Sequence, residues 1–364
     1  MFEVDLLIVG AGPAGLCAAL EAGQQGLTVL LVDENAKPGG QLFKQIHKFF
    51  GSEMHKAGTR GFRIGEDLVR EIAACPNITL WLDSVVFSAI DQNHFEVVHN
   101  CSVQVIKTKK VIVATGAIEK GLVFPGWTLP GVMGAGALQT MINVNRVRPG
   151  NKLLMVGSGN VGLIVSYQFL QAGGESVILV EAANRIGGYG VHASKIRRYG
   201  TNIITGCSVE SVSGNGKVES AILAKVDDKF QTIKGTQWEE KVDIVAIAVG
   251  LYPLMELLRQ LGCKFTMCPA LGGWVPVHDE RMETSINGIF IAGDVSGAEE
   301  ASTAMEEGRL AAWSATYDLA KCTKNKYESV RIDITKRLEA LRSGPYGIAR
   351  KNAKDSIYAI AKKF

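Results

Sequence analysis

The sequence has no pair of cysteines spaced to form a redox or metal-binding motif. Its 364 residues include seven cysteines, but no two stand in C-x-x-C spacing. Zinc and cluster sites need two close cysteine pairs, so we expect no metal site in this chain. Scattered single cysteines are instead typical of free thiols in a reducing compartment.

Excess charge of one sign and long apolar runs are also lacking. Lys and Arg number 39 against 36 Asp and Glu, which leaves a net charge of +3. Nucleic-acid binders usually show a strong basic excess, so nucleic acid is not an expected partner. No apolar stretch approaches the ~18 residues that a membrane span requires. Residues 1–10 show no signal-peptide pattern, and we therefore expect a cytoplasmic protein without a membrane span.

Proline is scarce and glycine is plentiful. The chain has ten prolines and 41 glycines, and 47% of its residues are hydrophobic. Glycine in this quantity is typical of the many tight strand-to-helix turns of an alternating α/β fold. At about 150 residues per domain, the length predicts two to three domains.

The first 33 residues fit a dinucleotide-binding βαβ unit. We expect a strand at residues 5–9, the glycine turn at 10–15, a helix at 16–25, a second strand at 27–32 and the acid at Asp33. In such a unit Gly10 allows the tight turn, Gly12 lets the backbone approach a pyrophosphate, and Gly15 lets helix and strand pack closely. Amides at the helix start hold the phosphates, and Asp33 accepts hydrogen bonds from the ribose hydroxyls.

The same pattern recurs in the middle of the chain. We expect a strand at residues 152–156, the glycine turn at 157–162, a helix at 163–172, a second strand at 176–180 and the acid at Glu181. Glu181 would repel a 2′-phosphate, so NAD is expected here rather than NADP. The expected NAD contacts are Gly157, Gly159, Asn160, Val161, Gly162 and Glu181. Alternatively, the second fold keeps its glycines for packing alone.

Three further apolar strands end in small or acidic residues. They are expected at residues 110–114, 244–249 and 288–292, and the last runs into Gly293-Asp294. Open α/β sheets bind ligands at the carboxyl ends of their strands, so these tips are expected to complete the binding sites.

With these motifs the chain resembles the two-dinucleotide-fold flavoproteins, the superfamily of thioredoxin reductase and glutathione reductase. The resemblance covers about residues 4–320. It implies an α/β fold with two Rossmann-like domains: a discontinuous FAD domain (1–122 and 252–325), an inserted NAD-type domain (123–251) and a helical C-terminal extension (326–364). The FAD contacts that it implies are Gly10, Gly12, Pro13, Ala14, Gly15, Asp33, Glu34, Gly40, Gln41, Val86, Ala114, Thr115, Gly116, Gly293, Asp294 and Ala301.

One departure from that superfamily is informative. Its disulfide reductases carry a redox cysteine pair either just after the glycine pair or inside the second fold. Here residues 39–44 read GGQLFK, and the second fold has no C-x-x-C. A dithiol relay needs both thiols, so we expect an oxidoreductase that is not a disulfide reductase.

Two longer segments, residues 38–62 and 123–141, look like a narrower subunit family. It is the family found in hydrogen cyanide synthase, opine oxidase, D-hydroxyproline dehydrogenase and dye-linked proline dehydrogenase. The resemblance implies an electron-transfer subunit that accompanies a second flavoprotein subunit, which oxidises the C–N bond of an amino acid or amine. Only Cys322 lies where several members add an iron–sulfur cluster, so a small separate subunit could carry such a centre. We assign no catalytic residue.

Two other functions remain open at this stage. One is a freestanding NADH-dependent flavin reductase that passes electrons to a soluble acceptor. The other is a nucleotide-binding assembly subunit without a redox role, in which the site after Val9 holds a plain adenine nucleotide.

Several single features allow both a functional and a structural interpretation. His47 and His55 flank a basic run and are either proton donors or ordinary loop histidines. Trp127 is expected to pack in a core. The C-terminal residues 350–363 predict a basic amphipathic helix that docks either on a partner or on its own domain.

Overall fold

The computed structural model describes residues 1–49 and 52–363, and the chain forms two compact units. Unit 1 comprises Met1–Ile118 and Tyr252–Phe364, and unit 2 comprises Glu119–Leu251. The chain enters unit 2 through strand β7 (Ala117–Glu119) and returns through β16 (Leu251–Pro253). Phe50 and Gly51, which belong to the basic segment 38–62, lie outside the described residues. The expected α/β fold is confirmed by the alternation of strands and helices.

Unit 1 is built on a sheet whose central strands are parallel. In spatial order these are β3 (Ile78–Trp81), β2 (Val29–Val32), β1 (Phe2–Val9), β6 (Ser102–Val113) and β19 (Ile289–Ile291). Strand β6 is long enough for two different strands to pair with it along the same edge. Its first half pairs antiparallel with β5 (His94–His99), which continues to β4 (Val85–Ala89), and its last residues pair in parallel with β19.

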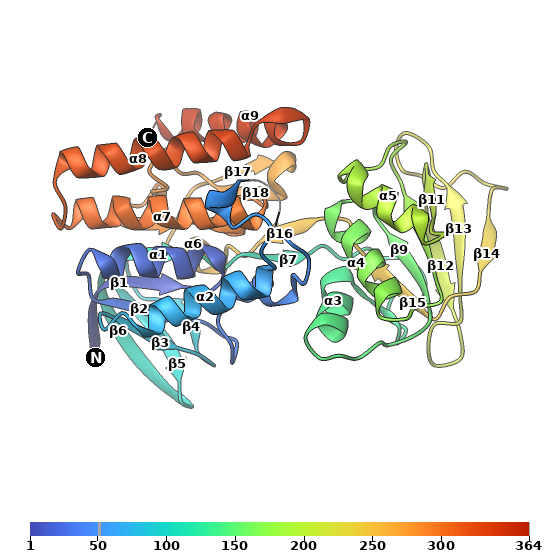
Figure 1. Cartoon of the computed structure of the whole chain (residues 1–364), viewed down its shortest axis with the longest axis horizontal. Helices are drawn as coiled ribbons and strands as arrows, with labels where there is room; N and C mark the ends of the chain where they lie inside the picture. The colour runs from blue at the N-terminus through green and yellow to red at the C-terminus, as the bar shows by residue number, and fades with distance from the viewer. Residues whose placement is uncertain (50–51, 364) are drawn as a thin grey trace. The chain divides into compact units, whose positions relative to one another are not determined.

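The remaining elements of unit 1 are mostly helical. The helices are α1 (Pro13–Gln24), α2 (Gly61–Ala73), α6 (Glu256–Gln260), α7 (Ala301–Asp318), α8 (Lys324–Leu341) and α9 (Gly344–Ala361). Short 3-10 turns and a hairpin complete it: η1 (Gly40–Lys44), η2 (Glu53–His55), η3 (Pro269–Leu271), η4 (Gly293–Ser296), β17 (Phe265–Cys268) and β18 (Gly273–Pro276). Figure 1 shows α7 lying along α1, with α8 on the far side of α7.

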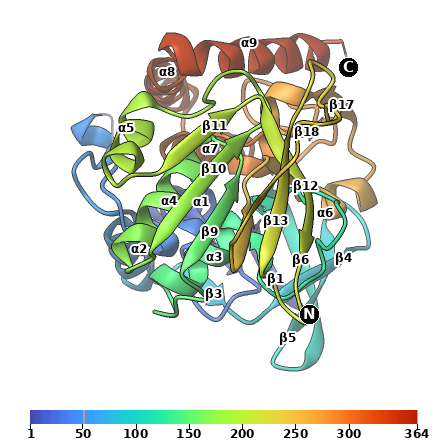
Figure 2. The same ribbon diagram turned by 90° about the vertical axis from the view of Figure 1, so that its right-hand side faces the viewer.

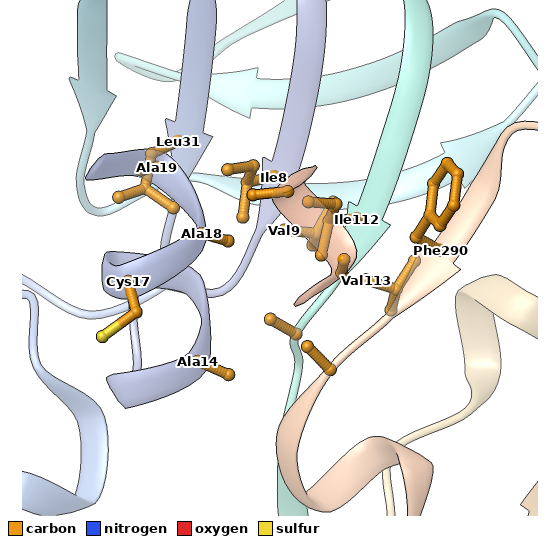
Figure 3. Packing of buried hydrophobic residues seen from close by; sticks show 14 of the residues in the cluster. Ile8, Val9, Ala14, Cys17, Ala18, Ala19, Leu31, Ile112, Val113 and Phe290 are labelled. Atoms are coloured by element: carbon orange, nitrogen blue, oxygen red, sulfur yellow. The ribbon is translucent and has the colours of Figure 1, made fainter. Parts of the chain in front are cut away.

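The helix pair α1–α7 packs so closely because glycine stands at the crossing point. A Cβ atom on Gly308 of α7 would lie 2.1 Å from the carbonyl oxygen of Ala14. On its other side, α1 presents small side chains to the strands, among them Ala18 and Ala19, beside Ile8 of β1 (Figure 3). Because β1 ends at Val9 and α1 begins at Pro13, the start of α1 lies next to the carboxyl end of β1.

Unit 2 repeats this plan with a shorter chain. Its parallel sheet runs in the order β11 (Asn202–Thr205), β10 (Ser176–Glu181), β9 (Lys152–Val156), β15 (Ile244–Ile247) and β8 (Val132–Gly134). Its helices are α3 (Ala135–Asn143), α4 (Asn160–Gln171) and α5 (Gly190–Arg198), and its antiparallel strands are β12 (Cys207–Ser213), β13 (Ser220–Lys225) and β14 (Trp238–Glu240).

The apolar run of β9 is explained by layers on both faces of this sheet. Successive side chains of a strand point to opposite faces. Leu153 and Met155 join a core with the helices, whereas Leu154 and Val156 join a second core with the antiparallel strands. Figure 2 shows β12 and β13 layered over the parallel strands.

Some boundaries differ from the sequence-based expectation. Helices α1 and α4 begin at Pro13 and Asn160, three residues earlier than predicted, because the last glycine of each turn already lies inside the helix. The expected core position of Trp127 is wrong, since its side chain is 45% exposed. Among the described residues, no helix is both long and apolar enough to pass through a bilayer.

Candidate functional site

In unit 1 the ends of three parallel strands bring three loops together. The amide of Ala114 donates to the carbonyl of Val9 at 2.8 Å, and the amide of Ala292 donates to the carbonyl of Val113 at 3.1 Å. A Cβ on Gly10 would lie 2.3 Å from the carbonyl oxygen of Ala114. The first glycine loop (residues 10–15), residues 114–116 and residues 293–296 therefore meet at the carboxyl edge of the sheet.

The three glycines of the first loop serve different purposes. Gly10 has a φ of +104°, which only glycine adopts readily, and a Cβ on Gly15 would lie 1.8 Å from the carbonyl oxygen of Gly10. Gly12 has an ordinary φ of −74°. A Cβ on Gly12 would have no atom within 4 Å. Packing therefore requires glycine at 10 and 15 but not at 12, where the bare backbone faces open space.

Asp33 at the end of β2 holds the first glycine loop. Its Oδ2 accepts a hydrogen bond from the amide of Ala11 at 2.6 Å, and its Oδ1 accepts from the backbone amide of Asn35 at 2.8 Å and from the side-chain amide of Asn35 at 2.9 Å. A carboxylate has about four acceptor positions. Asp33 thus keeps acceptor capacity for a ribose hydroxyl, while the neighbouring Glu34 is exposed.

The glycine pair after Asp33 lies along the same loop. The amide of Gly39 donates to the carbonyl of Ala11 at 2.7 Å. A Cβ on Gly40 would lie 3.0 Å from the Cα of Gly12. The next residue, Gln41, is exposed at the start of η1. The second glycine pair therefore packs directly against the backbone of the first glycine loop.

The loop after β6 is fixed by the returning chain. The hydroxyl of Thr115 donates to the carbonyl of Leu254 at 2.8 Å, and the amide of Leu254 donates to the carbonyl of Gly116 at 3.0 Å. Gly116 has a φ of +75°, and a Cβ there would meet no atom within 4 Å. Like Gly12, it leaves open space beside the backbone.

The third loop carries Asp294. Burial, together with the nearby carboxylates of Glu307 and Glu299, raises the pKa of Asp294 to about 7. The loop rests on α1, since a Cβ on Gly293 would lie 3.0 Å from the Cβ of Ala14. Asp294 is therefore a carboxyl group that is partly neutral near pH 7 and can donate as well as accept hydrogen bonds.

Two expected contacts stand at the margin of this site. Ala301 is the first residue of α7, seven residues after Asp294. Val86 lies in β4, half-buried and paired with Val97. The amide of Ser84, two residues before Val86, donates to the carbonyl of Asp33 at 3.0 Å. The structure thus brings the start of β4 to the end of β2.

Unit 2 repeats the geometry of the first glycine loop. In its loop (residues 157–162), a Cβ on Gly157 would lie 2.4 Å from the carbonyl oxygen of Ala248, and a Cβ on Gly162 would lie 2.2 Å from that of Gly157. A Cβ on Gly159 would meet nothing within 4 Å. Asn160 begins α4, and the side chain of Val161 is exposed. Packing again accounts for the outer glycines and not for the middle one.

Glu181 plays the part in unit 2 that Asp33 plays in unit 1. Its Oε2 accepts from the amide of Ser158 at 2.8 Å, and its Oε1 accepts from the amide of Ala183 at 2.9 Å. Each acid therefore accepts hydrogen bonds from two backbone amides. One belongs to the residue that follows the first glycine of the loop, and the other belongs to the residue two positions after the acid.

The repeat extends to a second glycine pair that the sequence-based prediction missed. Gly187-Gly188 begins six residues after Glu181, just as Gly39-Gly40 begins six residues after Asp33. The amide of Gly188 donates to the carbonyl of Ser158 at 2.8 Å. A comparison of the two halves, acid by acid, would have found it.

His55 is the last residue of the 3-10 turn η2. It is buried, with Nδ1 2.9 Å from the hydroxyl of Ser52 and Nε2 3.3 Å from a carboxylate oxygen of Glu306. His47 is half-buried. In the adjacent basic run, Arg63 forms an exposed ion pair with Glu66 at 2.7 Å. The basic segment therefore contains both a solvent-exposed charge, on Arg63, and a buried histidine, His55.

The basic C-terminal helix is folded onto unit 1. Ala353, Lys354 and Ile357 of α9 are buried, and the ammonium of Lys354 lies 2.9 Å from a carboxylate oxygen of Glu307. The expectation that Lys354 belongs to the charged face of an amphipathic helix is wrong for this residue. A buried ion pair leaves no signature in hydrophobic periodicity, so neither partner could be identified from the pattern.

Several relatives of known name are subunits of opine oxidase and hydrogen cyanide synthase. The chain is 28% identical over 340 residues to an opine oxidase subunit from Agrobacterium tumefaciens (strain Ach5), which covers 86% of this chain and 66% of that subunit. It is 28% identical over 363 residues to hydrogen cyanide synthase subunit HcnB of Pseudomonas aeruginosa, covering 94% of this chain and 77% of that subunit. The chain thus spans slightly less than two thirds of the opine oxidase subunit.

Solved structures show the same fold. A thioredoxin reductase of T. acidophilum superposes with a TM-score of 0.72 at 22% identity, covering 88% of this chain and 100% of that one. An L-proline dehydrogenase chain of P. horikoshii gives a TM-score of 0.68 at 24% identity, covering 93% of this chain and 59% of that one.

The family assignment rests on the longest match. The model of the pyridine nucleotide-disulphide oxidoreductases covers residues 4–308, which include both glycine loops and the Asp294 loop. The resemblance expected from the motifs is confirmed, and the chain belongs to the pyridine nucleotide-disulphide oxidoreductase family.

Proposed function

We propose that this chain is an FAD-dependent electron-transfer subunit of a hetero-oligomeric amino-acid or amine dehydrogenase. The observation that carries the proposal is the bare backbone at Gly12, which packing does not explain and which faces open space at the carboxyl edge of the sheet. A ligand that needs close backbone approach does explain it.

The residues of unit 1 fit FAD from end to end. Asp33 has acceptor capacity for the adenosine ribose, Gly12 leaves room for the pyrophosphate, and Asp294 can hydrogen-bond the ribityl hydroxyls. When bound, FAD supplies the redox chemistry, and the chain's own groups hold and orient it. Unit 1 is accordingly our proposed FAD domain.

Unit 2 is proposed to bind NAD. Gly159 leaves the same open space as Gly12, which favours a ligand over packing alone. Glu181 at the end of β10 disfavours a 2′-phosphate.

Disulfide reduction is not part of the proposal. All seven cysteines are free thiols, and no two stand in C-x-x-C spacing. Cys17, which lies in α1, is buried, and this burial raises the pKa of its thiol to about 11. A thiol that stays protonated is a poor nucleophile, so Cys17 is unsuited to a dithiol relay.

The partner is proposed to be a second flavoprotein subunit that oxidises the C–N bond, and the assembly is proposed to include a small iron–sulfur subunit. The opine oxidase relative, HcnB and the 28%-identical alpha subunit of sarcosine oxidase from Corynebacterium sp. (strain P-1) are all named as subunits. We propose that this assembly lies in the cytoplasm.

The test is a visible spectrum followed by an anaerobic addition of NADH. The purified chain, titrated with FAD, is expected to become yellow, and NADH alone is expected to bleach it slowly. Rapid bleaching without any partner would instead favour a freestanding flavin reductase. A chain that stays colourless with excess FAD would contradict the proposal and favour an assembly subunit that holds a plain adenine nucleotide. Copurification from the native source would identify the partner chains.

A further inference from the structure

Glu307 of α7 holds the loop that carries Asp294. Its carboxylate is buried, 1% exposed. Its Oε2 accepts hydrogen bonds from the amide of Gly293 at 3.0 Å and from the hydroxyl of Ser296 at 2.7 Å. These two donors stand on either side of Asp294, so one carboxylate oxygen fixes both ends of η4.

The other oxygen of Glu307 faces cations from the C-terminal helices. Oε1 lies 2.9 Å from the ammonium of Lys354 on α9 and also pairs with Arg342, the residue that ends α8. Arg342 in turn pairs with Glu299 at 2.7 Å. The negative charge next to the Asp294 loop is thus balanced by the last two helices of the chain.

Lys354 also contacts the loop itself. Its ammonium donates to the carbonyl of Ser296 at 3.0 Å and to the hydroxyl of the same residue at 2.6 Å. A third neighbour is Nε2 of His278 at 3.5 Å. Nδ1 of His278 donates to the carbonyl of Pro276 at 2.9 Å, and burial lowers the pKa of the ring to about 3. The neutral ring can therefore accept from Lys354.

We propose that Lys354 is a positioning residue for Asp294, so that docking of α9 sets the conformation of residues 293–296 and thereby the retention of FAD. The FAD part of this inference rests on the proposed function, whereas the positioning of the loop does not. The polar contacts of Lys354 converge on Ser296 and Glu307, both of which hold this loop.

A general loss of stability is the competing explanation, and the chain offers a matched control. Removing one member of a buried ion pair leaves the remaining charge less well compensated. In Lys354→Met the carboxylate of Glu307, next to the loop, loses one of its two cations and keeps Arg342. Lys362 follows α9 directly and forms an exposed ion pair with Glu280 at 2.8 Å. Lys362→Met therefore removes a lysine and an ion pair from the same end of the chain without touching the loop.

The first experiment needs no flavin. Amide hydrogen exchange is measured for residues 293–297 in the FAD-free full chain. Lys354→Met is expected to raise exchange in this segment at least tenfold relative to α1, and Lys362→Met is expected to leave it within twofold. Unchanged exchange in Lys354→Met would overturn the proposal. Ser296→Ala removes only a hydroxyl and serves the same test if Lys354→Met does not fold.

The second experiment measures the Kd for FAD and the flavin spectrum. Lys354→Met is expected to weaken binding at least tenfold. Adding Glu307→Gln removes the charge that Lys354 no longer balances and keeps an acceptor for Gly293, but it does not replace the contacts of Lys354 with Ser296, so the Kd is expected to stay weakened. Restoration of the Kd to within threefold would show that the charge on Glu307 was responsible and would overturn the proposal. A wild-type Kd in Lys354→Met with faster loop exchange would overturn the link to FAD. A wild-type chain that binds no FAD would contradict the proposed function and leave the exchange result to decide the positioning of the loop.

Discussion

At the scale of single residues, the glycines of the two loops divide by what each would contact if it carried a side chain. Gly15 and Gly162 would each drive a methyl group into a carbonyl oxygen, at 1.8 Å and 2.2 Å. Gly12 and Gly159 would meet nothing. The first kind is required by the fold, and the second kind is free to serve a ligand.

The pair Gly12 and Gly15 therefore separates binding from folding. Gly12→Ala is expected to change the free energy of unfolding by no more than about 1 kcal/mol, the loss of a good N-cap residue, while FAD affinity falls at least tenfold. Gly15→Ala is expected to cost about 3 kcal/mol or more, because the methyl group cannot fit. Urea denaturation and FAD titration of both variants measure this. Equal loss of stability in the two would contradict the division.

Asp294 gives a pH-dependent prediction. Its pKa is about 7 in the folded chain, above the ordinary 3.8. The folded state therefore binds its proton more tightly than the unfolded state, and this contribution to stability is lost as the pH rises from about 4 through 7. Relative to wild type, Asp294→Asn is expected to gain about 2 kcal/mol of unfolding free energy between pH 4.5 and 7.5, since structural relaxation around the charge reduces the full effect.

The comparison uses the difference between the two chains at each pH. Glu307 and His278, whose pKa values are lowered to about 2 and about 3, keep the same protonation state in the folded chain over this pH range and do not contribute to that difference. Urea denaturation at four pH values measures it. A difference that does not vary with pH would show that Asp294 has an ordinary pKa.

At the scale of elements, α9 is a structural part of unit 1. Ile357 is 1% exposed and packs with Leu271 and Val275, whereas Ile348 on the same helix is 49% exposed. Ile357→Ala is expected to lower the free energy of unfolding by about 2–4 kcal/mol through the cavity that it leaves. Ile348→Ala is expected to stay within about 0.5 kcal/mol. Equal effects in chemical denaturation would show that α9 is not docked in solution.

At the scale of the whole molecule, two glycine loops of the same geometry predict two separable nucleotide sites. Gly12→Ala is expected to weaken FAD binding and leave NADH binding within twofold, and Gly159→Ala is expected to do the reverse. Calorimetric titration of each variant with each nucleotide measures this. Wild-type NADH affinity in Gly159→Ala would show that the second loop keeps its glycines for another reason.

Much of the local structure could be predicted from the sequence. The strand over 152–156 has the expected bounds, and the order of strand, glycine loop, helix and acid holds in both halves. These signals are local, because an apolar run and a glycine turn act over a few residues. The predicted helix starts are three residues late, since in both units a glycine inside the helix resembles part of the turn.

The amino-acid sequence by itself determined the duplicated βαβ units, the acids that end their second strands and the absence of a C-x-x-C pair. Only the tertiary structure decided that Lys354 turns inward to Glu307 and that His55 lies against Glu306. The reason is physical: a buried charge is tolerated only where it is paired, and in these two cases a distant part of the chain supplies the partner. Lys354 and Glu307 are 47 residues apart in the sequence, and no local pattern records that they meet.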